Sequence, residues 1–246
     1  MLSREFLIQR GYCCGHGCLM CPYEPKHTEG NTKMKDIYKM NDSYGSAKEL
    51  DKQTLIVCAL EMETQGQLEN YDVLYTGVGK VNATIRLMER LSGIFLSREG
   101  ALLPSVVINY GTAGSRRIEK KTLVDCTKFI QRDMDVTGLG FQRGETPFED
   151  EPPIVLQTLS PFNPIGRNLT CGTGDNFAED KSQYYGEVVD MEAYALAKVC
   201  TYYAVPFISF KYITDGADES AHDDWVANLA DGVQEFKKIM EVFEGI

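Results

Sequence analysis

The sequence has no long hydrophobic run and no excess of basic residues. Its apolar residues occur in short stretches, none of which approaches the length that crosses a membrane. The amino terminus lacks the apolar core of a signal peptide, so we expect a cytoplasmic protein. Acidic residues outnumber basic ones by 36 to 25, which gives a formal net charge of −11. This charge argues against nucleic acid or a membrane surface as a partner, because neither would meet a basic face.

The apolar content is sufficient for one sizeable domain. The chain has 246 residues, of which 43% are hydrophobic, and this suits one main domain with an appendage. We expect residues 1–25 to form a cysteine-rich unit and residues 26–52, with their Gly, Asn and charged residues, to form a linker. Residues 53–246 are expected to form the main domain.

Four of the eight cysteines lie close together in the run CCGHGCLMC. Close Cys spacing with intervening glycines is typical of a knuckle whose thiolates bind one tetrahedral metal ion. Zinc or an iron–sulfur cluster is the expected occupant, with the ligands Cys13, Cys14, Cys18 and Cys21. The alternative is a tail of reduced thiols, because two adjacent cysteines are awkwardly placed to bind the same ion. The other four cysteines occur in apolar runs and are expected to be small buried residues in a reducing cytosol.

The stretch 187–215 predicts a strand, a helix and a second strand, with acidic residues at the end of each strand. The expected bounds are 187–190 for the first strand, 191–203 for the helix and 206–213 for the second strand. Ligands of α/β sheets bind beyond the carboxyl ends of strands. We therefore expect Asp190, Glu192 and Asp215 to meet at one pocket. Asp190 is equally explained as a helix cap or a support behind the site.

The runs VVDMEAYALAKVC and KYITDGAD in this stretch resemble the nucleoside phosphorylase/nucleosidase superfamily. Within it, they are most similar to the 5′-methylthioadenosine/S-adenosylhomocysteine nucleosidases. The resemblance covers about residues 54–243. It implies an α/β fold with three layers, α/β/α, around a mixed, twisted sheet. It also implies a homo-oligomer that hydrolyses the N-glycosidic bond of a 5′-substituted adenosine, releasing adenine without a catalytic cofactor. The cysteine run resembles small, uncharacterised domains with a CCGxGCxxCPY motif, and this implies no activity.

A predicted buried strand, LIVCAL, is followed at once by Glu61-Met62-Glu63. Taken alone, these acids are explained by the preference for negative charge in the first turn of a helix. The resemblance implies more, because Glu63 matches the family's carboxylate that activates water. Phosphorolytic relatives instead need basic residues that bind phosphate, and none occurs between Leu55 and Tyr75. Hydrolysis is therefore favoured, with a purine nucleoside phosphorylase or a catalytically silent nucleoside-binding protein as the alternatives.

Further candidates for the pocket follow other predicted strands. The run GTAG ends the strand expected at 105–110, and such small residues let a backbone approach a ligand closely. The resemblance places its Gly111 and Thr112 beside the ribose and the water. Phe177 follows a glycine-rich strand end; by itself it is more often a core residue, but the resemblance places its ring on the base. Val136 follows the strand expected at 123–131 and by resemblance borders the sugar.

Cleavage of an N-glycosidic bond requires an acid at the purine, carboxylates near the ribose and a base for water. Asp215 follows apolar residues, and such surroundings disfavour the charged carboxyl, so we expect it to be the general acid. Glu192, with Met191 beside it, is expected to bind the ribose hydroxyls. Lys211 stands where similar nucleosidases often have Arg, and we expect it to hold Glu63 or the water.

Two remaining segments carry no predicted chemistry. Residues 138–167 are rich in Gly, Pro and acids, which predicts a long surface excursion. Residues 223–244 have apolar side chains at three- and four-residue steps, which predicts one packing helix with Asp223 as its cap.

Overall fold

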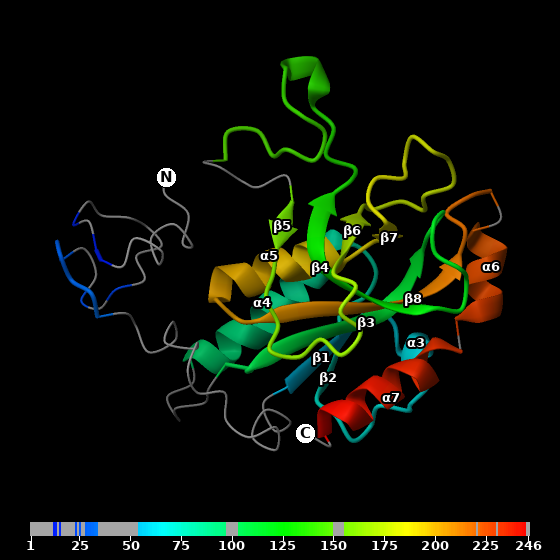
Figure 1. Ribbon diagram of the computed structural model, residues 1–246, viewed down its shortest axis with the longest axis horizontal. Helices are drawn as coiled ribbons and strands as arrows, with labels where there is room; N and C mark the ends of the chain where they lie inside the picture. Colours follow the sequence, from blue (N-terminus) through cyan, green and yellow to red (C-terminus); the bar gives the residue numbers. More distant parts are fainter. Residues whose placement is uncertain are drawn as a thin grey trace. The chain divides into compact units, whose positions relative to one another are not determined.

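A computed structural model of the chain describes residues 12, 13, 15, 23, 25, 28–33, 54–96, 103–149, 155–219, 221–229 and 231–244. The chain divides into two compact units, one of residues 1–45 with 148–152 and one of residues 46–147 with 153–246. The larger unit contains every helix and strand named below (Figure 1).

In the smaller unit, the described residues include a short backbone ladder. The amide of Cys13 donates to the carbonyl of Asn31 at 2.8 Å, and the amide of Gly30 donates to the carbonyl of Cys13 at 2.8 Å. The other three predicted metal ligands, Cys14, Cys18 and Cys21, lie outside the described residues. Within the described part of the chain, no three His, Cys, Asp or Glu side chains are grouped to hold a metal ion. The cysteine metal site therefore stays a prediction.

The centre of the larger unit is a mixed sheet of eight described strands, in the order β2-β1-β3-β7-β6-β4-β5 with β8 against both β3 and β4. The strands are β1 Thr54–Cys58, β2 Val73–Tyr75, β3 Val106–Gly114, β4 Leu123–Gln131, β5 Leu156–Gln157, β6 Leu169–Thr173, β7 Val188–Asp190 and β8 Phe207–Asp215. β8 pairs with β3 in parallel and with β4 in antiparallel direction. Because β3 and β4 are also linked through β7 and β6, the strands β3, β7, β6, β4 and β8 close into a ring. Gly114, at the end of β3, pairs with both Val189 and Asp215, so the carboxyl ends of β3, β7 and β8 come together.

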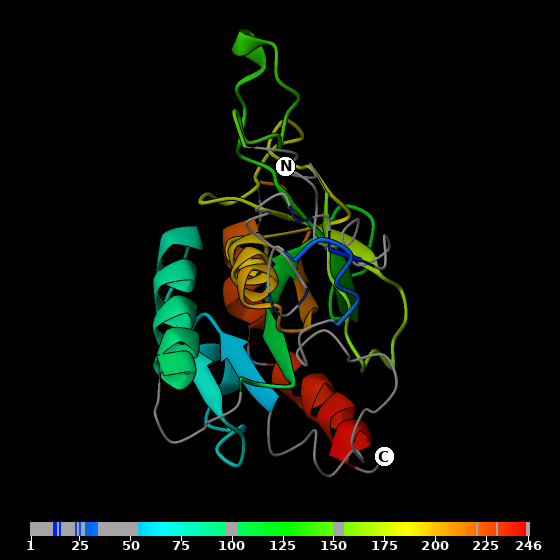
Figure 2. The ribbon, with the colours of Figure 1, turned by 90° about the vertical axis from the view of Figure 1, so that its left-hand side faces the viewer.

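Helices cover both faces of this sheet, which confirms the predicted three-layer α/β/α fold. The helices α4 (Lys80–Leu96) and α5 (Ala193–Tyr203) lie on one face and α7 (Gly232–Glu244) on the other (Figure 2). The short helices α3 (Glu61–Thr64) and α6 (Ala221–Asn228) lie next to the strand ends. Among the described residues, no helix is both long and apolar enough to span a membrane.

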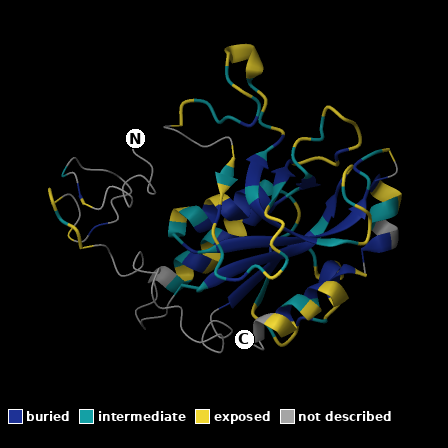
Figure 3. Cartoon of the chain, in the orientation of Figure 1, coloured by how far each residue is buried: buried dark blue, intermediate teal, exposed yellow. Residues whose placement is uncertain are grey.

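Strand alternation divides the core into two halves. Leu55 and Val57 of β1 belong to the cluster packed against α4 and α5, whereas Ile56 and Cys58 belong to the cluster packed against α7. This follows from the two-residue period of a strand, whose successive side chains point to opposite faces. Figure 3 shows the result: the central strands are buried, the edge strands β2 and β5 are less so, and exposure is concentrated on the outer sides of the helices and on the loops.

The prediction of one helix over 223–244 is wrong, because α6 and α7 are separate helices. α6 begins at Ala221, so Asp223 lies in its first turn and does not precede it. The Asn228 side chain donates to the carbonyl of Thr214 at 2.9 Å, which ties the end of α6 to β8. At the start of α7, a β-carbon on Gly232 would lie 2.5 Å from the Tyr212 ring. The apolar period continues across the break, so periodicity alone could not reveal it.

Two other expectations need adjustment. β3 runs on to Gly114 instead of ending at 110, because it pairs with β8 as far as Asp215, with an irregularity between Ala113 and Gly114. The excursion 138–167 is not wholly irregular: its two-residue strand β5 pairs with β4. A 3₁₀ turn, η2 (Thr137–Leu139), lies near the start of this excursion, at the tip of the long loop after β4 (Figure 1).

Candidate active site

Four carboxylates line one cavity at the strand ends of the larger unit. Glu63 comes from α3 after β1, Glu192 from the residue before α5, and Asp215 from the end of β8. Asp190 and the aromatic side chains of Phe177 and Trp225 also line it. The ring closure described above explains this meeting, because it brings together strand ends that are far apart in the sequence.

Glu63 is buried and held by three donors. Its Oε1 accepts hydrogen bonds from the amide of Thr112 at 2.9 Å and from the Thr112 hydroxyl at 3.0 Å. Its Oε2 accepts one from the amide of Leu60 at 3.0 Å. These bonds fix the carboxyl plane. Gly111 lies close to this carboxyl group. A β-carbon at this position would be 3.3 Å from Lys211 Nζ and 3.4 Å from Glu63 Oε1, so a side chain there would crowd both groups.

Glu192 occupies the position before the first turn of α5 and is almost fully buried. Its Oε1 accepts a hydrogen bond from the amide of Gly79 at 2.8 Å. Burial, followed by the nearby charge of Asp190, raises the pKa of Glu192 to about 8. This carboxyl therefore binds a proton near neutral pH and would ionise most readily when donors from a ligand approach it.

Asp215, at the end of β8, is the third of these carboxyl groups and is also buried. Its Oδ1 accepts the amide of Ala217 at 2.9 Å and its Oδ2 the hydroxyl of Thr214 at 2.9 Å. Burial nevertheless raises the pKa of Asp215 above its ordinary value. A raised pKa is what a carboxyl group needs if it is to donate a proton.

Asp190 stands behind these groups in a fully buried ion pair. Its Oδ2 lies 2.8 Å from Lys211 Nζ and accepts the amide of Ala193 at 2.8 Å, and its Oδ1 accepts the hydroxyl of Thr173. Burial alone would raise the pKa of Asp190, but the Lys211 ammonium and the hydrogen bonds from Thr173 and Ala193 together outweigh burial and lower this pKa. In turn, the carboxylate raises the pKa of Lys211 against the effect of burial. Both groups are therefore charged.

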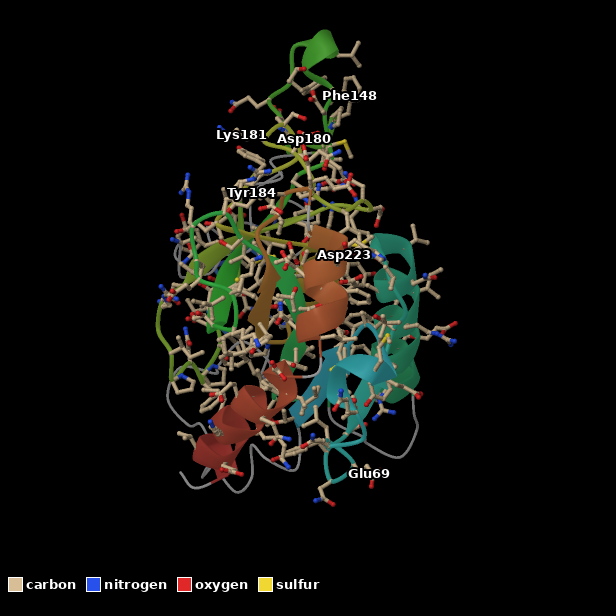
Figure 4. The ribbon with its side chains drawn as sticks, turned by 90° about the vertical axis from the view of Figure 1, so that its right-hand side faces the viewer. Glu69, Phe148, Asp180, Lys181, Tyr184 and Asp223 are labelled. Carbon is tan, nitrogen blue, oxygen red and sulfur yellow. The ribbon has the colours of Figure 1, made fainter. Side chains whose placement is uncertain are left out.

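An aromatic and polar wall completes the cavity. Phe177, 38% exposed, meets Trp225 of α6 edge to face with ring centroids 6.3 Å apart. Arg132, buried just beyond β4, donates to the Asn176 side chain at 3.0 Å and to backbone carbonyls of the loop after β6. In Figure 4, that loop carries Asp180 and Tyr184, and α6 with Asp223 stands in front of the strands.

The predicted site residues are distributed as follows. Of the predicted residues, Met191, Thr112 and Phe177 line the cavity beside Glu63, Glu192 and Asp215. Gly111, Lys211 and Val136 are not part of its lining in the single chain. Lys211 binds Asp190, and Val136 lies at the start of η2 on the projecting loop. The assignment of Val136 to the pocket wall stays a prediction.

Trp225 and Arg132 are among the lining residues that sequence reasoning missed. The rule that ligands bind beyond strand ends could have identified Arg132, because it directly follows β4. Trp225 fitted the apolar period of a packing helix, so the pattern assigned it to the core. Its indole instead donates to the Thr112 hydroxyl at 2.9 Å.

A mixed sheet with buried carboxylates and an aromatic side chain at its strand ends defines an α/β protein with a small-molecule site. A family model described as the phosphorylase superfamily matches residues 64–243, and the chain belongs to this superfamily.

Curated relatives and solved structures agree with this assignment. The chain is 30% identical over 178 residues to a 5′-methylthioadenosine/S-adenosylhomocysteine nucleosidase of Haemophilus ducreyi, covering 64% of this chain and 73% of the relative. It is 31% identical over 184 residues to the enzyme of the same name from an Exiguobacterium species, with the same coverage. The solved futalosine hydrolase of Helicobacter pylori superposes with a TM-score of 0.64 at 22% identity, over 79% of this chain and 98% of that one. At such identity the likeness is one of fold.

Proposed function

We propose that this protein hydrolyses the N-glycosidic bond of a 5′-substituted adenosine, of the 5′-methylthioadenosine or S-adenosylhomocysteine type, and releases adenine. The observation that carries this proposal is the meeting of Glu63, Glu192 and Asp215 around one cavity beside Phe177. Curated relatives at 30–31% identity are named nucleosidases for these two substrates. The chemistry uses side chains only and requires no cofactor.

The departing purine would be served by Asp215 and Phe177. Breakage of the bond between C1′ and N9 leaves negative charge on the base, and a proton delivered to N7 neutralises it. Asp215 can supply that proton because burial favours its neutral form. Phe177 is half exposed at the cavity wall, where its ring can lie against a flat heterocycle.

The sugar would be held by Glu192 with Met191 beside it. As the base departs, positive charge develops on the ribose ring, and an ionised carboxylate near the ring stabilises this charge. A carboxylate also accepts two hydrogen bonds from a vicinal diol. Because the pKa of Glu192 is about 8, we expect ribose binding to draw a proton off this residue.

The attacking water would be activated by Glu63. Water oxygen bonds to C1′, the C1′–N9 bond breaks, one water proton passes to Glu63, and the proton of Asp215 goes to the purine. The atoms balance without phosphate. The three donors to Glu63 keep its carboxyl group in a single orientation for this step.

Phosphorolysis requires cations that are free to bind phosphate. Among the described residues, the two buried cations near the cavity are held by other groups, apart from the buried Nε of Arg132, which has no hydrogen-bond partner. Lys211 is paired with Asp190, and the Arg132 guanidinium donates to Asn176 and to backbone carbonyls. These contacts support hydrolysis over the phosphorylase alternative.

We extend the proposal to the assembly and to the amino-terminal part. Residues 1–25 are proposed to bind zinc or an iron–sulfur cluster through Cys13, Cys14, Cys18 and Cys21, joined by the linker 26–52 to the nucleosidase domain 53–246. The protein is proposed to be a cytoplasmic homo-oligomer. Metal analysis of the purified chain beside a Cys18→Ser/Cys21→Ser variant tests the first point, and light scattering tests the second.

The decisive experiment measures adenine release from 5′-methylthioadenosine with and without phosphate, beside the Asp215→Asn variant. Release in phosphate-free buffer that collapses in the variant supports hydrolysis with Asp215 as the acid. Strict dependence on phosphate would favour phosphorolysis and remove the role of Glu63. The absence of release in both buffers, for S-adenosylhomocysteine as well, would contradict the proposed substrate class.

A further inference from the structure

Helix α6 is connected through the side chain of Trp225 to Glu63, the residue proposed to activate water. The indole Nε1–H of Trp225 donates to Thr112 Oγ1 at 2.9 Å, and this hydroxyl donates to Glu63 Oε1 at 3.0 Å. Side chains from α6, β3 and α3 thus form one hydrogen-bonded chain, and all three line the cavity.

The direction of this chain follows from the donors available. An indole N–H can only donate, a hydroxyl has one proton, and an ionised carboxylate can only accept. Trp225 therefore obliges Thr112 to accept in the first bond, and the single proton of Thr112 points to Glu63. Without the indole, the hydroxyl could rotate and give its proton elsewhere.

The two oxygens of Glu63 are then unequal. Oε1 receives both the amide and the hydroxyl of Thr112, which fill its two lone-pair sites. Oε2 receives one hydrogen bond, from the amide of Leu60, and keeps a second site among the described contacts. Oε2 is thus the oxygen that can accept a proton from a bound molecule.

The helix that carries Trp225 is firmly attached on both sides. The Asn228 side chain binds the carbonyl of Thr214 in β8, and Asp224 forms an ion pair with Lys120 from the β3–β4 connection. The Trp225 ring also meets Phe177, so one indole contacts both the wall proposed for the base and the residue that holds Glu63.

We propose that Trp225 is a positioning residue for the hydrolysis: through Thr112 it orients Glu63 so that Oε2 takes the proton of the attacking water. This inference rests on the proposed function, because it assigns a part in that same reaction. It adds a residue outside the three carboxylates and identifies the oxygen that acts.

The test is a double-mutant cycle on adenine release. Trp225→Phe keeps an aromatic ring and removes the N–H, and Thr112→Val keeps the shape and removes the hydroxyl. We expect Trp225→Phe to lower kcat about 10-fold with KM changed less than about twofold, as for the loss of one hydrogen bond felt mainly in the transition state. In the Thr112→Val background, Trp225→Phe should not lower kcat any further. In the Thr112→Ser background, which retains the hydroxyl, the 10-fold loss should return.

A matched control separates the hydrogen bond from the attachment of α6. Lys120→Met removes an ion pair of the same helix and leaves the indole in place, so kcat should stay within about twofold of the wild type. Multiplicative losses in the Trp225/Thr112 cycle, or an effect of Trp225→Phe on KM alone, would overturn the proposal.

A second readout does not depend on turnover, so it separates this inference from the proposed function. Trp225 is the only tryptophan of the chain, and its fluorescence reports on its own N–H. Thr112→Val should shift the emission maximum to shorter wavelength, whereas Thr112→Ser should leave it unchanged. An emission maximum that neither variant moves would overturn the hydrogen-bonded chain even in a protein that cleaves adenosines. If the expected shift occurs but no adenosine is cleaved, the proposed function fails and the chain of hydrogen bonds stands.

Discussion

A β-carbon placed on Gly114 would lie 2.4 Å from Oδ1 of Asp215, closer than real β-carbons approach any atom. The two residues are neighbours across β3 and β8, at the point where the strand register shifts. The carboxyl of the proposed general acid therefore occupies the space that any other residue at 114 would need. The glycine is required for this approach and not for an unusual backbone angle.

We predict that Gly114→Ala displaces Asp215 and lowers kcat about 100-fold, the order expected when a catalytic group moves by about 1 Å. Stability should change much less than activity. Gly138→Ala is the matched control, because its added β-carbon would meet nothing within 4 Å. Kinetics of adenine release on both variants check this, and equal activities would contradict the proposed role of Asp215.

The activity should fall as the pH rises. Asp215 must be protonated to donate, and burial raises its pKa, so the active form persists above the ordinary range of an Asp and is lost as pH passes the raised pKa. We predict that Asp215→Asn loses about 10²–10⁴-fold in kcat and also loses this alkaline decline. The measurement is a pH profile of kcat for both proteins. A decline that persists in the variant would assign it to a different group.

The stability should depend on Glu192 in a pH-dependent way. Its pKa of about 8 in the folded protein lies above the ordinary 4.5, so the folded state binds the proton more tightly than the unfolded chain does. The contribution of this tighter proton binding to the free energy of unfolding is complete below pH 4.5 and is lost as the pH rises to about 8. Glu192→Gln cannot ionise, so we predict that its free energy of unfolding exceeds that of the wild type at pH 8.5 and approaches it at pH 5. Urea unfolding at both pH values checks this; a constant difference would contradict it.

Removal of Lys211 should destabilise the fold, because it leaves the Asp190 carboxylate buried without its countercharge. We predict a loss of about 3–5 kcal/mol in the free energy of unfolding for Lys211→Met. The double variant Asp190→Asn/Lys211→Met should recover a large part of this, because no unpaired charge is then buried. Chemical denaturation of the wild type, the two single variants Asp190→Asn and Lys211→Met, and the double variant gives the coupling free energy between the two residues. Additive losses would mean that the pair is not coupled.

Much of this architecture could be predicted from local patterns. The strands β1, β3 and β8 contain apolar runs, β3 ends in glycine and β8 ends in Asp215, and the helical spacing of apolar residues in α5 is visible in the residues themselves. The rule that ligands bind at strand ends placed Glu192 and Asp215 correctly at one cavity. Local patterns failed at α6 and α7, because the apolar period runs through the break between them.

The sequence by itself determined which strands carry acidic side chains at their ends, since strand period and strand ends depend on neighbours along the chain. Only the tertiary structure decided which side chains pair with which. Lys211 binds Asp190 and Trp225 binds Thr112 because β8 lies against both β3 and β4 and closes the ring of strands, and α6 is tied to β8. Trp225 and Thr112 are 113 positions apart, and only the closed sheet brings them to hydrogen-bonding distance.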